Sequence, residues 1–214
     1  QFGKGDKYFG VCTMMATMPG LPMFGHGQLE GFEEKYGMEF RRAQRVEPID
    51  QGLLDEHWRR ISPLLHRRAL FAGAAEFLLY DCFDGGGHVN EDVYAYSNRV
   101  GDEAALVLFH NRYADAHGWI RWSAAYAEKR ADGSRPLRQR TLADGLGLPG
   151  GDHLVRCREL VTGQEFLLRT TSLRDHGMPV TLGGYGSRVF IDWRVVHEDG
   201  RPWRELENQL AGAG

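Results

Sequence analysis

The sequence lacks long apolar runs and has few cysteines, and these two absences exclude several classes of protein. No segment approaches the ~20 apolar residues that a membrane-spanning helix needs, and the Met-rich stretch Val11–Met18 ends at Pro19. Cys12, Cys82 and Cys157 are widely spaced and form no CxxC pair. We therefore expect no membrane partner and no disulfide scaffold. The odd cysteine count favours a reducing compartment, which we take to be the cytoplasm.

The sequence also lacks a strong charge of either sign. Lys and Arg number 26 against 29 Asp and Glu, so the net charge of −3 gives no reason to expect a nucleic-acid partner. The 214 residues suffice for one large domain or two small ones. The sequence begins with Gln1 and enters an apolar helical pattern within a few residues, which is how a piece of a longer chain would begin.

The first third of the sequence predicts a helix, a short strand, a long loop and a second helix. Apolar residues at helical spacing predict the first helix over Asp6–Met18, and Leu21–Phe24 is a short apolar strand. A polar loop fills Gly25–Glu47. A second apolar stripe, Leu54, Trp58, Ile61 and Leu65, predicts a helix from Asp50 to about Leu70, which Pro63 should kink or split. This order is one repeating unit of an α/β barrel.

After residue 75 the apolar pattern changes to a period of two, which is typical of strands. Glycine-rich and Gly-Asp turns separate the segments, and short strands at this spacing predict an antiparallel β-sandwich. A short amphipathic helix, Pro202–Leu210, follows the last strand. The strand candidates are Glu76–Cys82, Asp92–Asn98, Ala104–Asn111, Trp119–Tyr126, His153–Arg158, Glu165–Thr171 and Ser187–Val196.

The segment Gly20–Gly31 combines Gly-x-Pro, a short apolar stretch and a glycine-bounded polar turn. This pattern is similar to the eighth-strand motif of α-amylase-family glycoside hydrolases. The sequence departs from the motif at Gly25 and His26, where the family usually has aromatic residues, and at Glu30, where the acid comes one place late. The residues that match are Gly20, Pro22, Gly27, Gln28 and Gly31.

The order of elements extends the resemblance over nearly the whole chain. The family places one helix before this strand, a long helix after it, and then an all-β domain. Val93–Arg99, a Gly-Asp turn and Ala105–Asn111 resemble the opening hairpin of that domain. The resemblance implies an α+β fragment: residues 1–72 would be the last βα portion of a TIM (β/α)8 barrel, and residues 73–214 the C-terminal sandwich.

The resemblance implies a complete enzyme that hydrolyses or transfers α-glucosidic bonds with retention, through a glycosyl-enzyme intermediate. Its substrate would be an α-glucan or oligosaccharide. The family's three catalytic carboxylates would lie before Gln1, so we expect no catalytic residue here, and no metal or cofactor. Two alternatives stay open, a non-catalytic carbohydrate-binding module and a purely structural sandwich. An exposed row of aromatic side chains would favour the first of these.

His26, Gln28 and Glu30 are the candidate substrate-binding residues. They follow Phe24, at what would be the C-terminal end of a barrel strand, where barrel enzymes build their sites. Imidazole and amide groups can hydrogen-bond to sugar hydroxyls, and a carboxylate can orient either. The competing interpretation is that these side chains hold the turns of the loop. Glu33–Lys35 should form a solvated face, and we do not interpret its acids as a catalytic pair with Glu30.

Two further motifs have a structural and a functional interpretation. The segment Asp84–Asp92 is rich in oxygen ligands, but it lacks the EF-hand spacing and is better explained as a glycine-rich connection. Trp119, Trp122 and Tyr126 could stack on sugar rings. On a regular strand Trp122 and Tyr126 share a face, which we assign to the core. Trp119 takes the opposite face, where an exposed indole would favour sugar binding.

Overall fold

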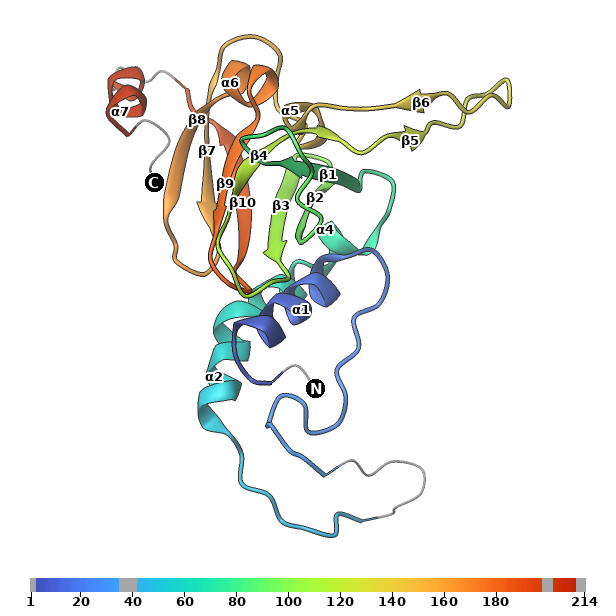
Figure 1. Cartoon of the computed structure of the whole chain (residues 1–214), viewed down its shortest axis with the longest axis vertical. Coiled ribbons are helices and arrows are strands. Elements are labelled where there is room, and N and C mark those ends of the chain that lie inside the picture. Colours follow the sequence, from blue (N-terminus) through green and yellow to red (C-terminus); the bar gives the residue numbers. More distant parts are fainter. Residues whose placement is uncertain (1–2, 35–41, 198–201, 211–214) are drawn as a thin grey trace.

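The computed structural model describes residues 3–34, 42–197 and 202–210. A curled antiparallel sheet forms most of the molecule, and a group of helices packs on its outer side (Figure 1). The helices are α1 (Asp6–Thr17), α2 (Gln51–Arg60), α3 (Ser62–His66), α4 (Arg68–Ala72), α5 (Leu142–Gly145), α6 (Thr170–Asp175) and α7 (Trp203–Leu210). The strands are β1 (Leu78–Phe83), β2 (Val93–Val100), β3 (Glu103–His110), β4 (Ala116–Ser123), β5 (Tyr126–Ala127), β6 (Leu137–Arg138), β7 (Leu154–Glu159), β8 (Glu165–Arg169), β9 (Met178–Leu182) and β10 (Ser187–Val195).

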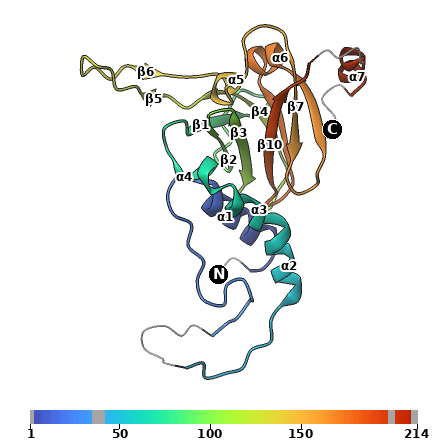
Figure 2. The same ribbon diagram turned by 180° about the vertical axis from the view of Figure 1, so that it is seen from behind.

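Eight of the strands form one sheet in the order β8-β7-β10-β3-β2-β1-β4-β9. Every neighbouring pair is antiparallel. The sheet curls until its two edge strands, β8 and β9, line the same cleft. The short pair β5–β6 projects from the sheet as a separate hairpin (Figure 2). This arrangement agrees with the predicted α+β class and is compatible with the predicted β-sandwich.

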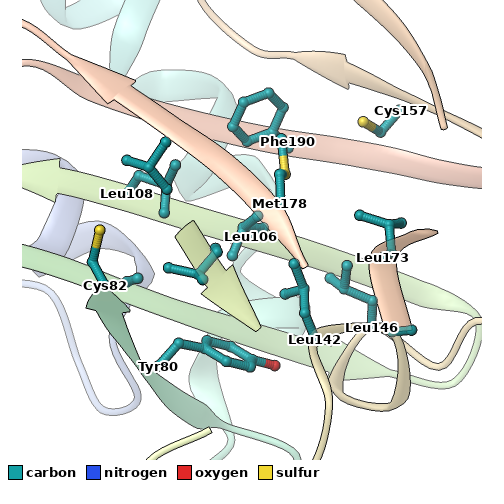
Figure 3. Packing of buried hydrophobic residues seen from close by; sticks show 14 of the residues in the cluster. Tyr80, Cys82, Leu106, Leu108, Leu142, Leu146, Cys157, Leu173, Met178 and Phe190 are labelled. Atoms are coloured by element: carbon teal, nitrogen blue, oxygen red, sulfur yellow. The ribbon is translucent and has the colours of Figure 1, made fainter. Parts of the chain in front are cut away.

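The inner face of the curled sheet encloses the larger hydrophobic core. Leu106 and Leu108 of β3 and Phe190 of β10 point into it, and Met178 of β9 closes it from the opposite side (Figure 3). The helices α5 and α6 cap this core, with Leu142 and Leu173 buried.

The helices α1, α3 and α4 cover the outer face of β2, β3 and β10 and form a second core. Phe9 and Cys12 of α1 are buried there against Val107 and Ile191 of the sheet. Strand β3 is therefore covered on both faces, which explains its nearly unbroken apolar sequence. Gly10 lets α1 come this close, because a Cβ there would overlap the ring of Phe109.

The long helix predicted from Asp50 to about Leu70 is divided into α2, α3 and α4. Pro63 lies in the first turn of α3, where proline is tolerated, so the predicted break is confirmed. The side chain of Asp50 caps α2 by accepting a hydrogen bond from the backbone N–H of Leu53, at 3.1 Å.

The short strand predicted at Leu21–Phe24 is wrong. The segment is extended but belongs to no strand, and Leu21 and Met23 are 84% and 75% exposed. Among the described residues no neighbouring strand offers it a ladder of hydrogen bonds, and an isolated extended segment is not a strand. The barrel origin of residues 1–72, and the boundary at residues 72 and 73, stay predictions.

The remaining predictions for single elements have mixed outcomes. Helix α1 and the terminal helix α7 are confirmed, and within the predicted loop Gly25–Glu47 residues 35–41 lie outside the described residues. In the described parts of the chain, no helix has both the length and the apolar character needed to cross a membrane.

Candidate functional site

The loop that carries the three candidate residues is folded back on itself. The backbone N–H of Gln28 donates to the carbonyl oxygen of Gly25 at 3.2 Å, and that of Phe32 donates to Gly27 at 2.8 Å. The backbone of Glu30 accepts a hydrogen bond from the N–H of Asp50 at 2.9 Å, which ties the loop to the start of α2. The loop is therefore a defined structure next to α1 and α2.

The side chain of Gln28 is used within the protein at both ends. Its Oε1 accepts a hydrogen bond from the backbone N–H of Gly25 at 2.9 Å, and its Nε2 lies 3.9 Å from the Sγ of Cys12. The hydroxyl of Tyr8 donates a hydrogen bond to the backbone carbonyl oxygen of Gln28 at 3.5 Å. Gln28 thus holds the turn together, as the competing structural interpretation of this residue requires.

His26 and Glu30 differ from Gln28 in their surroundings. His26 is exposed, and its ring lies 6.4 Å from that of Phe32. Glu30 is half-buried. Burial lowers the pKa of the His57 imidazole, and the negative charge of the Glu30 carboxylate raises it by a smaller amount. The structure therefore turns Gln28 and Glu30 toward the helices and leaves His26 at the surface. A role for the three residues in sugar binding stays a prediction.

The acids further along the loop depart in part from the expected solvated face. Glu33 is exposed, but Glu34 is half-buried and its carboxylate accepts the backbone N–H groups of Gln44 and Arg45, at 2.9 and 3.1 Å. Lys35 lies outside the described residues. Glu34 is therefore a structural acceptor that ties two parts of the loop together.

Beneath the loop, the buried His57 pairs with the half-buried Tyr8, and the sequence pattern did not predict this pair. The Nε2 of His57 is 2.7 Å from the hydroxyl of Tyr8, and the aromatic rings of Phe9 and Phe24 surround the imidazole. Burial lowers the pKa of His57, and the nearby carboxylate of Glu30 only partly opposes this. Burial also raises the pKa of the Tyr8 hydroxyl. Both side chains are therefore neutral near pH 7.

The position of His57 shows that three of the four residues predicted for the stripe of the second helix, all except Ile61, were displaced by one residue. The buried residues are Leu53, His57, Ile61 and Leu64, which follow each other at helical spacing. Trp58, assigned to the core stripe, is instead 63% exposed. A histidine that replaces an apolar residue in a stripe is the signal that would have found this site.

A second surface of interest is the outer face of β1 and β4. Trp119 is 49% exposed, so its side chain faces solvent. Trp122 is 41% exposed, so its assignment to the core was wrong. Tyr126 is half-buried and packs against the main core. Trp122 faces outward because β4 has a bulge between Ile120 and Ser123, which interrupts the regular alternation of side chains between the two faces.

The glycine-rich connection at residues 84–92 is stabilised by its own acid. One carboxylate oxygen of Asp84 accepts the backbone N–H groups of Gly86 and His88, each at 2.9 Å. The hydrogen bond from the His88 backbone, and then that from Gly86, keep the pKa of Asp84 low although desolvation opposes them. Across the described ranges, no cluster of three or more His, Cys, Asp or Glu side chains is arranged to hold a metal ion.

Comparison with solved structures finds a similar fold in α-amylases. A noncanonic maltogenic α-amylase from Thermotoga neapolitana matches with a TM-score of 0.55 and 10% identity, over 90% of this chain and 37% of that chain. The α-amylase from Geobacillus thermoleovorans, complexed with acarbose, matches with a TM-score of 0.52 and 13% identity, over 88% of this chain and 33% of that chain. The chain therefore spans about a third of the length of these enzymes.

At this level of identity the likeness establishes the fold alone. No model of a protein family matches the sequence. The comparison with curated proteins gives no match either.

Proposed function

We propose that this chain is the C-terminal part of an α-amylase-family enzyme that hydrolyses or transfers α-glucosidic bonds with retention. The observation that carries the proposal is the match over 90% of this chain to only 37% of an α-amylase, which is the relation expected of a part to a whole. The order of the motifs supports it, since the Gly20–Gly31 segment precedes the β-sheet just as the eighth-strand motif precedes the all-β domain in the family.

The N-terminal segment supports the same proposal through its surface. Leu21 and Met23 are among the most exposed apolar residues, and Trp58 of α2 is 63% exposed. Apolar side chains gathered on one segment mark a surface that another part of the protein covers. In the proposed enzyme, the rest of a (β/α)8 barrel covers this surface, and residues 1–72 form its last βα portion.

The proposal assigns different tasks to the three loop residues. His26, which is exposed, is the residue that contacts the sugar. Gln28 positions the loop through its hydrogen bond to Gly25, and Glu30 lies behind it, tied to the start of α2. The catalytic carboxylates belong to the part of the enzyme upstream of Gln1, so this chain supplies binding and support.

The experiment that tests the proposal uses the complete enzyme, with the preceding reading frame expressed together with this chain. Release of reducing sugar from soluble starch or maltoheptaose, with the product's anomeric configuration followed by NMR, is the expected result. Inactivity on every α-glucan, in a protein shown to be folded by circular dichroism, would overturn it. His26→Ala should then raise KM, while the change Lys7→Ala on α1 should leave KM unchanged.

An alternative function is non-catalytic carbohydrate binding. It is favoured by one specific observation, the exposed aromatic side chains on the outer face of β1 and β4. The two functions are compatible in one protein, because a surface that binds the polymer can accompany a catalytic domain.

A further inference from the structure

Within the described residues, the helices cover only part of the outer face of the sheet. The helices α1 and α4 pack on β2, β3 and β10, with α3 packed on α1, and they stop short of β1 and β4. On these two strands four large apolar side chains point to solvent, and three of them are aromatic. We call the set the outer aromatic row: Leu79, Phe83, Trp119 and Trp122.

The outer aromatic row exists because of the bulge in β4. Tyr80 of β1 faces Ser123 of β4, and Cys82 faces Ile120, so one residue of β1 lies opposite two of β4. Ile120 and Ser123 are both fully buried. The two residues between them, Arg121 and Trp122, are therefore both directed outward, where a regular strand would direct only one of them.

The aromatic rings of the row are held by their neighbours. Phe83 and Trp119 are directly opposite each other on adjacent strands. The guanidinium of Arg121 lies over the ring of Trp122, 5.5 Å from its centroid, and its Nε donates to the carbonyl oxygen of Arg174 at 3.3 Å. The contact from Arg121 orders the indole without covering it, since Trp122 keeps 41% of its surface.

Polar side chains border the rings. His117 of β4 and Thr181 of β9 are paired across the two strands and are both exposed. His117 lies two residues before Trp119, on the same face of the sheet. Arg121 lies between the two indoles in the sequence. Exposed aromatic faces flanked by hydrogen-bonding groups match a sugar, which has apolar C–H faces and hydroxyl groups at its edges.

We propose that the outer aromatic row binds an α-glucan chain, with Trp119 and Trp122 stacking on its sugar rings. The assignment to α-glucan, as opposed to another polysaccharide, rests on the proposed function. The two indoles lie three residues apart on β4, up to ~10 Å at a strand's rise per residue, so the site takes an oligosaccharide and not a single sugar.

The composition of the row favours a saccharide over a protein partner. A stable protein interface buries about 800 Å² on each partner. The four side chains of the row, which are only about half-exposed, offer much less than this. Arg121 lies over one ring, and the exposed His117 adds a polar group beside the other. The row lies outside the 25–32 loop and on a different part of the sheet from the one that α1 covers.

The test is affinity electrophoresis of this chain in native gels that contain soluble starch, with titration of maltoheptaose by calorimetry. Wild type should be retarded by starch. Trp119→Ala and Trp122→Ala should each weaken binding about tenfold or more, as truncation of an aromatic anchor does, and the double variant should migrate as in a starch-free gel. The matched control is Trp58→Ala, which removes an even more exposed indole, at 63%, from α2 and should bind as wild type does.

Three results would overturn the proposal. The first is a wild-type chain that starch does not retard, and the second is a folded double variant that is retarded as strongly as wild type. The third is a wild-type dimer in sedimentation that Trp119→Ala dissociates, because the row would then be a contact between two copies. Retardation by a β-glucan and not by starch would overturn the α-glucan assignment.

The outcomes separate this inference from the proposed function. Starch binding by this chain, together with a complete enzyme that is inactive on α-glucans, would support the row and contradict the catalytic proposal. An active enzyme whose rate on starch granules is unchanged in the double variant would do the reverse.

Discussion

At Gly10, the usual effect of replacing a helical glycine by alanine should be reversed. In an exposed helix this change stabilises by about 1 kcal/mol. Here the added Cβ would overlap the ring of Phe109, which is fully buried and cannot move aside. We therefore expect Gly10→Ala to lower the free energy of unfolding by about 1–3 kcal/mol, measured by urea denaturation.

Gly52 of α2 provides the matched control for Gly10. The nearest atom to a Cβ at Gly52 is the Oδ1 of Asp50, at an ordinary 3.7 Å. Gly52→Ala should leave stability unchanged or slightly higher. Equal destabilisation at the two positions would show that the close approach of α1 to the sheet is not the cause.

Asp192 links the helices to the sheet and should make stability depend on acid pH. Its carboxylate lies 2.7 Å from Arg158 of β7 and 2.8 Å from Arg67 between α3 and α4. Burial by itself raises the pKa of Asp192, but the hydrogen bonds from Arg158 and then Arg67 outweigh it, so the pKa is below its usual value. The ionised Asp192 therefore contributes its full stabilisation above the pKa that it has in the unfolded chain. This stabilisation is lost as pH falls through the lower pKa that Asp192 has in the folded protein.

The measurement compares wild type with Asp192→Asn between about pH 6 and pH 3. Asparagine suits the site because Asp192 has a φ of 59°, a conformation that asparagine tolerates. Wild type should lose its advantage as pH falls, by roughly 1 kcal/mol because solvent reaches a third of the side chain. A constant difference between the two proteins over this range would contradict the assignment.

At the scale of the element, one arginine fastens the end of α1. The guanidinium of Arg68 donates to the carbonyl oxygens of Ala16 at 2.6 Å, Met18 at 3.2 Å and Phe71 at 3.3 Å, and also to Gly20. A cation is favourable at a helix C-terminus, where the last carbonyl groups lack partners. Arg68→Met should lower stability by about 1–3 kcal/mol and speed proteolysis just after α1.

The control for Arg68 is Arg59→Met on α2. Arg59 pairs with Glu56 at the surface, and such pairs contribute about 0.3–0.5 kcal/mol. If Arg59→Met accelerates cleavage after α1 as much as Arg68→Met does, the effect is not specific to the end of α1.

The elements that local sequence determines could be predicted, and those that depend on neighbouring strands could not. The β2–β3 hairpin was predicted because Gly101, with a φ of 58°, and Asp102 form a two-residue turn between apolar strands. Strand β9 was missed because Pro179 lies within it. Proline cannot donate to a ladder and is compatible only with a position such as this sheet edge, which the sequence does not reveal.

The candidate site could be predicted only in outline for the same reason. The loop and its polar residues were evident from glycines and charge, but the inward position of Gln28 depends on its contact with Cys12, sixteen residues away. The outward position of Trp122 depends on a bulge that only the pairing of β4 with β1 creates. The alternation of apolar and polar residues along one strand does not reveal a bulge that arises from pairing with another strand.

At the scale of the whole molecule, the segment between α1 and α2 should be the first to be cleaved. Residues 18–34 and 42–50 contain no helix or strand, and Leu21 and Met23 are exposed. Phe9 of α1 is buried against the sheet, so α1 should stay bound after the cut. Thermolysin digestion followed by mass spectrometry checks this. Initial cleavage within the sheet would contradict it.

The chain by itself should not turn over starch or maltoheptaose. A retaining glycosidase needs two carboxyl groups about 5–5.5 Å apart across the scissile bond, and the proposed enzyme holds them upstream of Gln1. A reducing-sugar assay should therefore give no signal above the buffer. Hydrolysis that is lost in Glu30→Gln or Glu33→Gln would instead place the catalytic centre in this chain.

The bulge in β4 also has an evolutionary consequence. Removing one residue between Ile120 and Ser123 would restore strict alternation, and the rest of the strand would keep its side-chain faces. The hydrogen bond from the backbone N–H of Arg140 to the hydroxyl of Ser123, at 3.0 Å, involves residues outside the insertion. A gain or loss of three nucleotides at this point can therefore add one outward side chain to the surface, or remove one, while Ile120 and Ser123 stay buried.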